Sequence, residues 1–223
     1  MKGLLIAVTL GLALVAAVGQ AGDRSLLIDN FEHGLSPKWQ TKSFKGQTLY
    51  RVVPDGGGHV LEAVSHDAAS GLIYPIKFSL RDYPILSWRW KVSNILPKGD
   101  ARIKAGDDYA ARVYVVFPSW FPPATRSINY IWANRLPRGT HVPNPFFSRA
   151  VMVAVESGPS KTGRWVSERR NVYEDYRKIF GGEPPEAGAI AIMTDTDNTG
   201  GSATAWYDDI TLERGKGRQE FER

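Results

Sequence analysis

Residues 86–92 carry the most restrictive pattern in the chain, because apolar and polar side chains alternate there without exception. The apolar positions are Leu86, Trp88, Trp90 and Val92, and the polar ones are Ser87, Arg89 and Lys91. Successive side chains of a β-strand point to opposite faces of its sheet. The segment is therefore predicted to be a strand with one buried face. Tryptophans that stack on a sugar are the alternative, but their aliphatic neighbours favour the core.

Glycine and proline divide the rest of the chain into short extended pieces. The sequence holds 22 glycines and 14 prolines, and Pro54–Gly58 is a typical hairpin turn. Further strands are expected at residues 26–31, 47–53, 59–65, 84–92, 109–117, 127–133, 150–156, 165–172, 189–194 and 203–212. Short strands separated by turns predict an all-β fold, an antiparallel β-sandwich of the jelly-roll type.

One segment departs from this pattern. Its apolar residues fall on one helical face, namely Val172, Tyr173, Tyr176, Ile179 and Phe180. Because Gly181 and Gly182 follow, the sequence predicts one short helix at 172–180. Two proline-rich loops, at 118–123 and 137–145, are expected to lie on the surface and to carry binding residues.

The first residues resemble an export signal. A positively charged Lys2 precedes an apolar run at 4–18, and Gly19–Ala21 offers a small-residue cleavage pattern. The run is shorter than the about 20 residues that a membrane-spanning helix needs, although an uncleaved anchor remains the alternative. We therefore expect a signal peptide at 1–21, a β-sandwich domain at 22–213 and a polar tail at 214–223. The expected location is periplasmic or extracellular, with no transmembrane segment after cleavage.

Composition excludes several classes of function. The chain has no cysteine, which rules out thiol redox chemistry and thiolate-bound metals. Its 28 basic and 23 acidic residues give a net charge of +5. The sequence contains no basic run that would indicate a nucleic-acid partner. The four histidines show no metal-ligand spacing, and no nucleophile elbow is present.

The strand expected at 109–117 supplies candidate binding residues. Asp108, Arg112 and Tyr114 share the parity opposite to Val113. Together with Arg89 they would form a polar face suited to hydrogen bonding with a sugar or a carboxylate. A solvated outer face with incidental ion pairs is the alternative reading.

Two later segments add polar groups. Residues 165–172 are polar on both sides and contribute Glu168 and Arg170, which indicates either an edge strand or a site. Residues 194–201 hold the densest oxygen cluster, with Asp195, Asp197 and Asn198. Calcium prefers such ligands, but the spacing departs from the EF-hand loop, and an Asx-rich turn is the alternative.

The two ends of the domain resemble known folds. The opening Asp29–Glu32 and the closing Tyr207–Ile210 resemble the first and last strands of galactose-binding-like jelly rolls and carbohydrate-binding modules. This resemblance implies a structural calcium between the terminal strands, for which the available ligands are Asp29, Glu32 and Asp209.

A second resemblance covers nearly the whole mature chain. It is carried by residues 106–113, 129–132, 168–171, 175–176, 180–181 and 195–199. These motifs together resemble a bacterial exported family catalogued only as a domain of unknown function. The resemblance implies a fold class and an envelope location, and it brings no activity.

These observations rank three functions. The first is an exported, non-catalytic protein that binds a glycan or another polar component of the cell envelope. Its predicted ligand-binding residues are Arg89, Asp108, Arg112, Tyr114, Trp132, Glu168, Arg170, Asp195, Asp197 and Asn198. The second is a glycan hydrolase or lyase that uses two carboxylates from Asp108, Glu168, Asp195 and Asp197. The third is an envelope assembly protein acting through the proline-rich loops and Phe146–Phe147.

Overall fold

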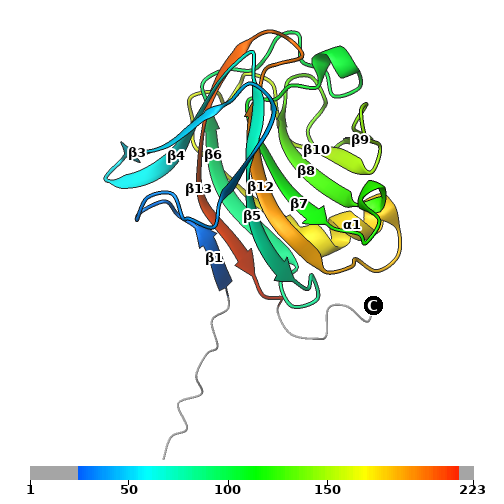
Figure 1. The fold of residues 1–223 in the computed structure, drawn as a ribbon. Coiled ribbons are helices and arrows are strands. Elements are labelled where there is room, and N and C mark those ends of the chain that lie inside the picture. Colours follow the sequence, from blue (N-terminus) through cyan, green and yellow to red (C-terminus); the bar gives the residue numbers. More distant parts are fainter. Residues whose placement is uncertain (1–24, 216–223) are drawn as a thin grey trace, which may run out of the picture.

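The computed structural model describes residues 25–215 as one β-sandwich (Figure 1). The predicted signal peptide, the first residues of the predicted domain and most of the predicted tail lie outside the described residues. Within the described part, no helix is long and apolar enough to span a membrane.

Two sheets form the layers of the sandwich. The six-stranded sheet has the order β11 (Val166–Asn171), β6 (Ile85–Val92), β13 (Ser202–Glu213), β4 (Gly58–His66) and β3 (Leu49–Asp55), with β1 (Ser25–Asp29) paired to the end of β13. The seven-stranded sheet has the order β2 (Gln40–Lys45), β5 (Ala69–Phe78), β12 (Ala187–Asp195), β7 (Arg112–Phe117), β8 (Arg126–Ala133), β10 (Ala150–Ser157) and β9 (His141–Pro143). All described pairs are antiparallel except β8 with β10. The predicted β-sandwich is confirmed.

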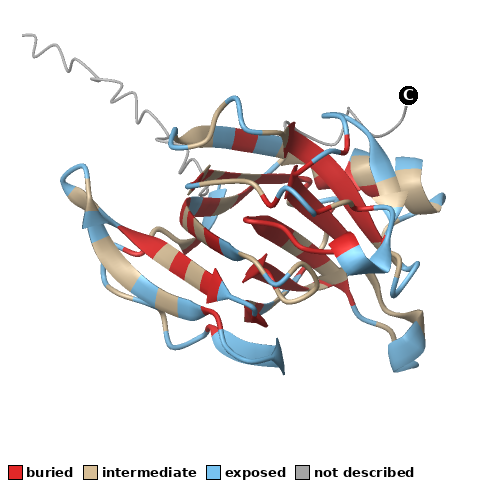
Figure 2. Ribbon diagram, turned by 90° about the horizontal axis from the view of Figure 1, so that it is seen from above, coloured by how far each residue is buried: buried red, intermediate tan, exposed pale blue. Residues whose placement is uncertain are grey.

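Aromatic side chains from both sheets fill the centre of the core. Trp88 and Trp90 of β6 are 2% and 0% exposed. The Trp88 ring lies 5.4 Å from that of Tyr130, and the Trp90 ring lies 5.9 Å from that of Trp132, both on β8. The alternation at 86–92 thus places its apolar side chains between the sheets, as predicted. Figure 2 shows the buried residues gathered along the central strands and the exposed ones mainly at loops and edges.

The local turn signals act as the sequence indicates. In the β3–β4 hairpin, Gly56 and Gly57 have φ of 61° and 94°, a conformation that glycine adopts without strain. The helix α1 (Val172–Phe180) begins where the Asn171 side chain accepts a hydrogen bond from the Glu174 amide at 3.2 Å. It ends at Gly181 with φ of 70°, so the predicted helix is confirmed.

Three strands were not expected from the sequence. β2 is exposed along its whole length, so it carries no apolar alternation. β5 contains Gly71 and Pro75, which usually interrupt strands. Proline is tolerated here because β2 pairs with β5 only from Ala69 to Ile73, which leaves the second edge of β5 without a neighbouring strand at Pro75. β9 has only three residues.

The outer face of the seven-stranded sheet is partly covered by long connections. A second apolar cluster lies there, made of Ala101, Tyr109, Ile131, Ala133, Leu136, Met152 and Ala154. Its β8 and β10 members alternate with residues of the main core, so they point away from the six-stranded sheet. The segments after β6 and after β8 therefore pack on this face and form walls beside the part that remains open.

Candidate functional site

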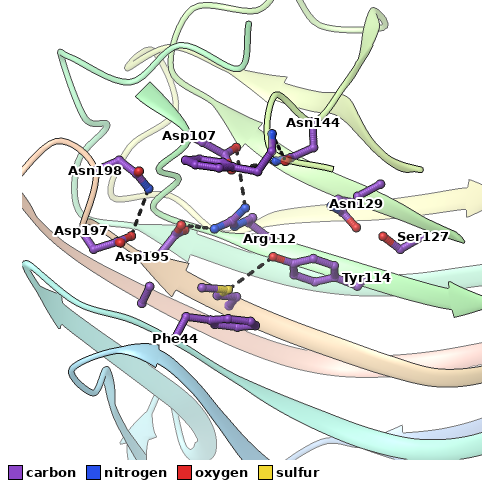
Figure 3. Close-up of a pocket in the computed structure, with 14 residues that line it drawn as sticks. Phe44, Asp107, Arg112, Tyr114, Ser127, Asn129, Asn144, Asp195, Asp197 and Asn198 are labelled. Carbon is purple, nitrogen blue, oxygen red and sulfur yellow. Dashed lines mark hydrogen bonds and ion pairs between the residues drawn. The ribbon is translucent and has the colours of Figure 1, made fainter. Parts of the chain in front are cut away.

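A cavity of about 380 Å³ lies on the outer face of the seven-stranded sheet, which is a volume typical of small-ligand sites. Strands β7, β8 and β12 supply its floor with Arg112, Tyr114, Asn129, Met193 and Asp195. Its walls come from Phe44 on β2 and from the loop residues Asp107, Asn144, Phe146, Asp197 and Asn198. Figure 3 shows these side chains converging from the strands and the loops.

Arg112 is the buried cation at the centre of the floor (Figure 3). Its side chain is 6% exposed; Nη2 binds Asp195 Oδ2, and Nη1 lies 4.0 Å from Asp107 Oδ1. The guanidinium also lies 4.8 Å from the centre of the Tyr109 ring. A charge out of water needs such partners. Arg112 is therefore committed to the protein's own carboxylates.

Asp108 supports the wall and does not line the cavity. Its Oδ2 accepts a hydrogen bond from the Thr199 amide at 2.6 Å, and its Oδ1 accepts one from the Asn198 amide at 3.2 Å. These bonds hold the turn that presents Asp197 and Asn198. Asp108 lies before β7, which begins at Arg112, so strand parity does not set its direction and these tertiary hydrogen bonds do.

Two buried acceptors at the cavity form no hydrogen bond among the described residues. They are Oδ1 of Asn129, which is 2% exposed, and Oδ1 of Asp107. The other amide or carboxylate atom of each is engaged: Asn129 Nδ2 donates to Met152 Sδ at 3.2 Å, and Asp107 Oδ2 accepts from Asn144 Nδ2 at 2.7 Å. Buried polar atoms are nearly always paired, so both oxygens are suited to receive a donor from a ligand.

Aromatic rings border this polar floor. Phe44 and Phe146 are 69% and 56% exposed, and Tyr114 is half-buried. The Tyr114 hydroxyl donates to Met193 Sδ at 3.4 Å. Burial raises the pKa of Tyr114, so its phenol stays protonated. Exposed ring faces beside hydrogen-bonding groups provide an apolar surface together with polar anchors.

An apolar hollow of about 180 Å³ adjoins the cavity. The two share Phe44, Tyr114 and Met193, and the hollow continues past Ile73 and Val116. The combined site therefore runs across several strands and offers room for an elongated ligand.

Acidic groups outnumber basic ones around the cavity. Asp108, Asp195 and Asp197 each place an oxygen within 4.8 Å of the others, and this is the acidic group within residues 25–215 whose spacing suits a metal ion. Burial and the nearby Asp108 raise the pKa of Asp197. The oxygens of Asp108 and Asp195 already accept hydrogen bonds from backbone amides and Arg112. These two carboxylates therefore help to hold the floor and the wall of the cavity in place.

Arg89 does not share a face with Arg112. It lies on β6, in the other sheet, and its side chain points outward beside Asp208 and Asp209. The expectation of one polar face holding Arg89, Asp108, Arg112 and Tyr114 is therefore wrong. Alternation predicts the two sides of a strand, but it contains no information on which sheet the strand joins.

Three other predicted residues also lie away from the cavity. Trp132 is 0% exposed in the core, where its Nε1 donates to the Gly158 carbonyl at 3.1 Å, so it offers no stacking face. Glu168 pairs in register with Trp88 at the edge of the six-stranded sheet and is 7% exposed. Burial raises the pKa of Glu168 to about 7. Arg170 binds Asp175 of helix α1 at 2.6 Å.

The three expected calcium ligands do not gather into one site. Asp29 Oδ2 accepts from Trp39 Nε1 at 2.8 Å, Glu32 Oε1 accepts from the His59 amide at 3.1 Å, and Asp209 lies 3.2 Å from Arg89. Each carboxylate thus has its own protein partner. The described residues give no support to calcium between the terminal strands.

The predicted ligand-binding residues include five of the 14 that line the cavity, namely Arg112, Tyr114, Asp195, Asp197 and Asn198. Asn129 has the same outward parity as Ile131 on β8, and reading that strand by alternation would have found it. Asp107 and Asn144 lie in loops, where no periodicity exists to indicate their direction. Phe44 is on the unpredicted strand β2.

Comparisons with known proteins place the chain in a family. A family model described as "Protein of unknown function (DUF3047)" matches residues 37–211. No protein with a curated description matches the sequence.

Solved structures with a similar fold include modules and adhesins. A family 11 carbohydrate-binding module from a Clostridium thermocellum cellulase has 13% identity and a TM-score of 0.47, covering 86% of this chain and 95% of that one. A family 30 module from the same organism has 12% identity, coverage of 86% and 99%, and a TM-score of 0.44. An adhesin domain of the Porphyromonas gingivalis Lys-gingipain has 12% identity, coverage of 86% and 98%, and a TM-score of 0.44. Similarity at this level assigns no ligand to this chain.

Proposed function

This chain belongs to the DUF3047 family of proteins of unknown function, and we propose that it is an exported, non-catalytic protein that binds a glycan in the cavity on its seven-stranded sheet. The observation that carries the proposal is the pairing of two chemistries in one hollow. Buried acceptors without a hydrogen bond, Asn129 Oδ1 and Asp107 Oδ1, lie beside the exposed rings of Phe44 and Phe146.

A sugar matches both chemistries. Its hydroxyl groups donate hydrogen bonds to buried acceptors, which would otherwise stay unpaired at a cost of about 1–3 kcal/mol each. Its C–H faces pack on aromatic rings. The adjoining apolar hollow extends the surface for a chain of several units. Oligosaccharides combine these properties more closely than small ions or flat aromatic ligands do.

The geometry argues against an acidic ligand. Arg112 is already bound to Asp195 and lies near Asp107, so it is not available as a clamp for a carboxylate. Three carboxylates line the cavity against this one guanidinium. The basic net charge of the whole chain is compatible with an acidic polysaccharide. The carboxylates of this cavity would nevertheless repel one.

Export is part of the proposal and rests on the sequence at 1–21. We expect the mature chain to begin near Gly22 and to be found in the periplasm or outside the cell. Expression of the full chain in a bacterial host, followed by cell fractionation and mass spectrometry of the N-terminus, tests this. An intact Met1 in the cytoplasmic fraction would contradict it.

Glycan binding is tested by titration calorimetry against oligosaccharides selected from a glycan array. Replacing Phe44 by alanine removes an exposed ring at the cavity and should weaken binding about tenfold, the equivalent of one aromatic contact of about 1.4 kcal/mol. Phe121→Ala is the matched control, because Phe121 is 52% exposed but does not line the cavity. Equal losses in both variants, or release of new reducing ends from the bound glycan, would contradict a non-catalytic site at this place.

A second candidate function is favoured by the exposed aromatic loops. Trp120, Phe121 and Phe147 are 95%, 52% and 40% exposed. Their loops precede β8 and β10, whose starts are joined by a hydrogen bond from the Ser127 amide to the Arg149 carbonyl at 3.1 Å. Exposed apolar side chains at one end of a sheet are typical of a protein-binding surface. Loss of an envelope partner in a Trp120→Ser and Phe121→Ser double variant that still binds glycan would support this role.

A further inference from the structure

The charges around the cavity are unbalanced. Asp107, Asp195 and Asp197 line it together with Arg112, and Asp108 lies directly behind the Asp197–Asn198 turn. Four carboxylates therefore lie at or beside the cavity with one buried cation among them. Burial excludes the water that would otherwise screen these charges.

Lysines near the rim do not reverse this balance. Lys45 binds Asp67 at 2.8 Å and the Asp197 carbonyl at 3.2 Å, and its side chain is 52% exposed. Lys104 lies 5.3 Å from the centre of the Phe146 ring, and the exposed Lys42 borders the adjoining hollow. Even with Asp67 and these lysines counted, the carboxylates outnumber the cations, and all three lysines lie outside the buried floor.

Among the buried groups of the cavity that lack a hydrogen bond, acceptors also outnumber donors. Asp107 Oδ1 and Asn129 Oδ1 are buried acceptors without a hydrogen bond. Among the described residues that line the cavity, Arg112 Nε is the one buried donor in this condition. Burial and the neighbouring Asp107 raise the pKa of Tyr109, so this phenol adds no negative charge. A fitting ligand therefore supplies donors and positive charge, with a hydroxyl oxygen available for Arg112 Nε.

We propose that the glycan bound in this cavity is an amino sugar oligomer whose free, protonated amine lies against Asp107. This inference rests on the proposed glycan-binding function and narrows it to one chemical class. An ammonium group carries three donors and one positive charge, and charge-assisted hydrogen bonds are about twice as strong as neutral ones. A sugar with an N-acetyl group or a hydroxyl in place of the amine lacks the charge.

The experiment compares three tetrasaccharides on the mature protein by titration calorimetry. The probes are a β-1,4-linked glucosamine tetramer, its N-acetylated form and a glucose tetramer of the same linkage. We expect the amine form to bind about 10- to 100-fold more tightly than the other two, as hydrogen bonds to a charged group predict. The difference should shrink at high salt and disappear when the pH is raised until the amine is neutral.

Two variants test whether the preference for the amine depends on Asp107. Asp107→Asn keeps the shape of the side chain and removes its charge, so it should lower the affinity for the glucosamine tetramer about tenfold more than the affinity for the glucose tetramer. Asp67→Asn is the matched control, because Asp67 pairs with Lys45 at the exposed rim, and it should change neither affinity. The salt and pH dependence of the wild-type protein provides the same test without any variant.

The outcomes separate this inference from the function on which it rests. Equal affinity for the three tetramers, a preference that persists at high pH, or tighter binding of an acidic oligosaccharide would overturn the amine assignment while leaving glycan binding in place. A preference that Asp107→Asn does not alter would also overturn it. Binding of none of the three tetramers, together with no binding on a glycan array, would remove the proposed function itself.

Discussion

The two outer faces of the sandwich carry the same kinds of side chain, but they enclose them differently, around hollows of about 380 Å³ at Arg112 and about 300 Å³ at Arg89. On the six-stranded sheet, Arg89 binds Asp208 at 2.5 Å and lies 4.6 Å from the centre of the Trp165 ring. Lys91 lies between the rings of Trp165 and Trp206, at 4.9 and 4.6 Å. This face is open, and its charged groups are paired with one another.

On the seven-stranded sheet, the equivalent arginine is enclosed. Arg112 is 6% exposed where Arg89 is 37% exposed. Long connections pack beside it, and Asn129 Oδ1 and Asp107 Oδ1 are buried there without a hydrogen bond. The comparison teaches that residue type alone does not distinguish a site from a solvated face. Glu168 Oε1, in the hollow beside Arg89, is also buried without a hydrogen bond, so the distinguishing features are the loop walls and the enclosed arginine.

The largest difference between the faces should be found in stability. Arg112→Ala leaves Asp107 and Asp195 buried without their cation, which should lower the free energy of unfolding by about 3–5 kcal/mol. Arg89 is 37% exposed and its partner Asp208 is 2% exposed, so Arg89→Ala leaves one buried carboxylate without its cation and should cost less, about 1–3 kcal/mol. Urea unfolding of both variants measures this. Equal losses would show that the two arginines lie in similar environments.

Glu168 lines the hollow beside Arg89, at the edge of the six-stranded sheet, and gives a pH-dependent effect. Its folded pKa of about 7 lies above the ordinary 4.5, so its contribution to stability is full below pH about 4.5 and is lost as the pH rises through about 7. Glu168→Gln should therefore raise the free energy of unfolding by up to about 3 kcal/mol at pH 8. At pH 4 it should have almost no effect. A variant that is equally stabilised at both pH values would show that burial of the charged Glu168 carboxylate is not the cause.

Ligand affinity should depend on one face only. Asn129→Leu removes a buried acceptor from the cavity and should weaken glycan binding about tenfold, the loss of one hydrogen bond. Arg89→Gln, on the opposite face, should leave the dissociation constant unchanged. Titration of both variants against the same oligosaccharide provides the measurement, and the reverse pattern would move the site to the six-stranded sheet.

The smallest effect is expected at Asp209, on the open face. Its side chain is 61% exposed, and it has a positive φ of 51°, a conformation that asparagine tolerates well. Asp209→Asn should therefore change the free energy of unfolding by no more than about 0.5 kcal/mol. Thermal unfolding detects a larger loss, which would indicate that this face is more tightly organised than its exposure suggests.

Alternation predicted both sides of the central strands. It identified Trp88 and Trp90 as core residues and set Arg112 and Tyr114 apart from Val113, because each of these strands has one buried face. It did not reveal that β6 and β7 join different sheets. A long connection separates β6 from β7. Packing across the whole domain therefore decides which sheet each of these strands joins.

Strand alternation could not predict the residues that form the walls of the cavity. The strand β2, which bears Phe44, is exposed throughout, so no pattern of burial marks it. The connections that carry Asp107 and Asn144 are fixed by tertiary hydrogen bonds, such as that between these two side chains at 2.7 Å. By contrast, the turn of Asp195–Asn198 stood out in the sequence because its oxygen-rich residues are adjacent.

NMR can show whether the seven-stranded sheet carries the binding face. Backbone amide shifts of the ¹⁵N-labelled mature protein are followed during titration with the tightest-binding oligosaccharide. The largest changes should cluster at Phe44, Arg112, Tyr114, Asn129 and Asn144. Changes centred on Arg89, Lys91 and Trp165 instead would contradict this expectation.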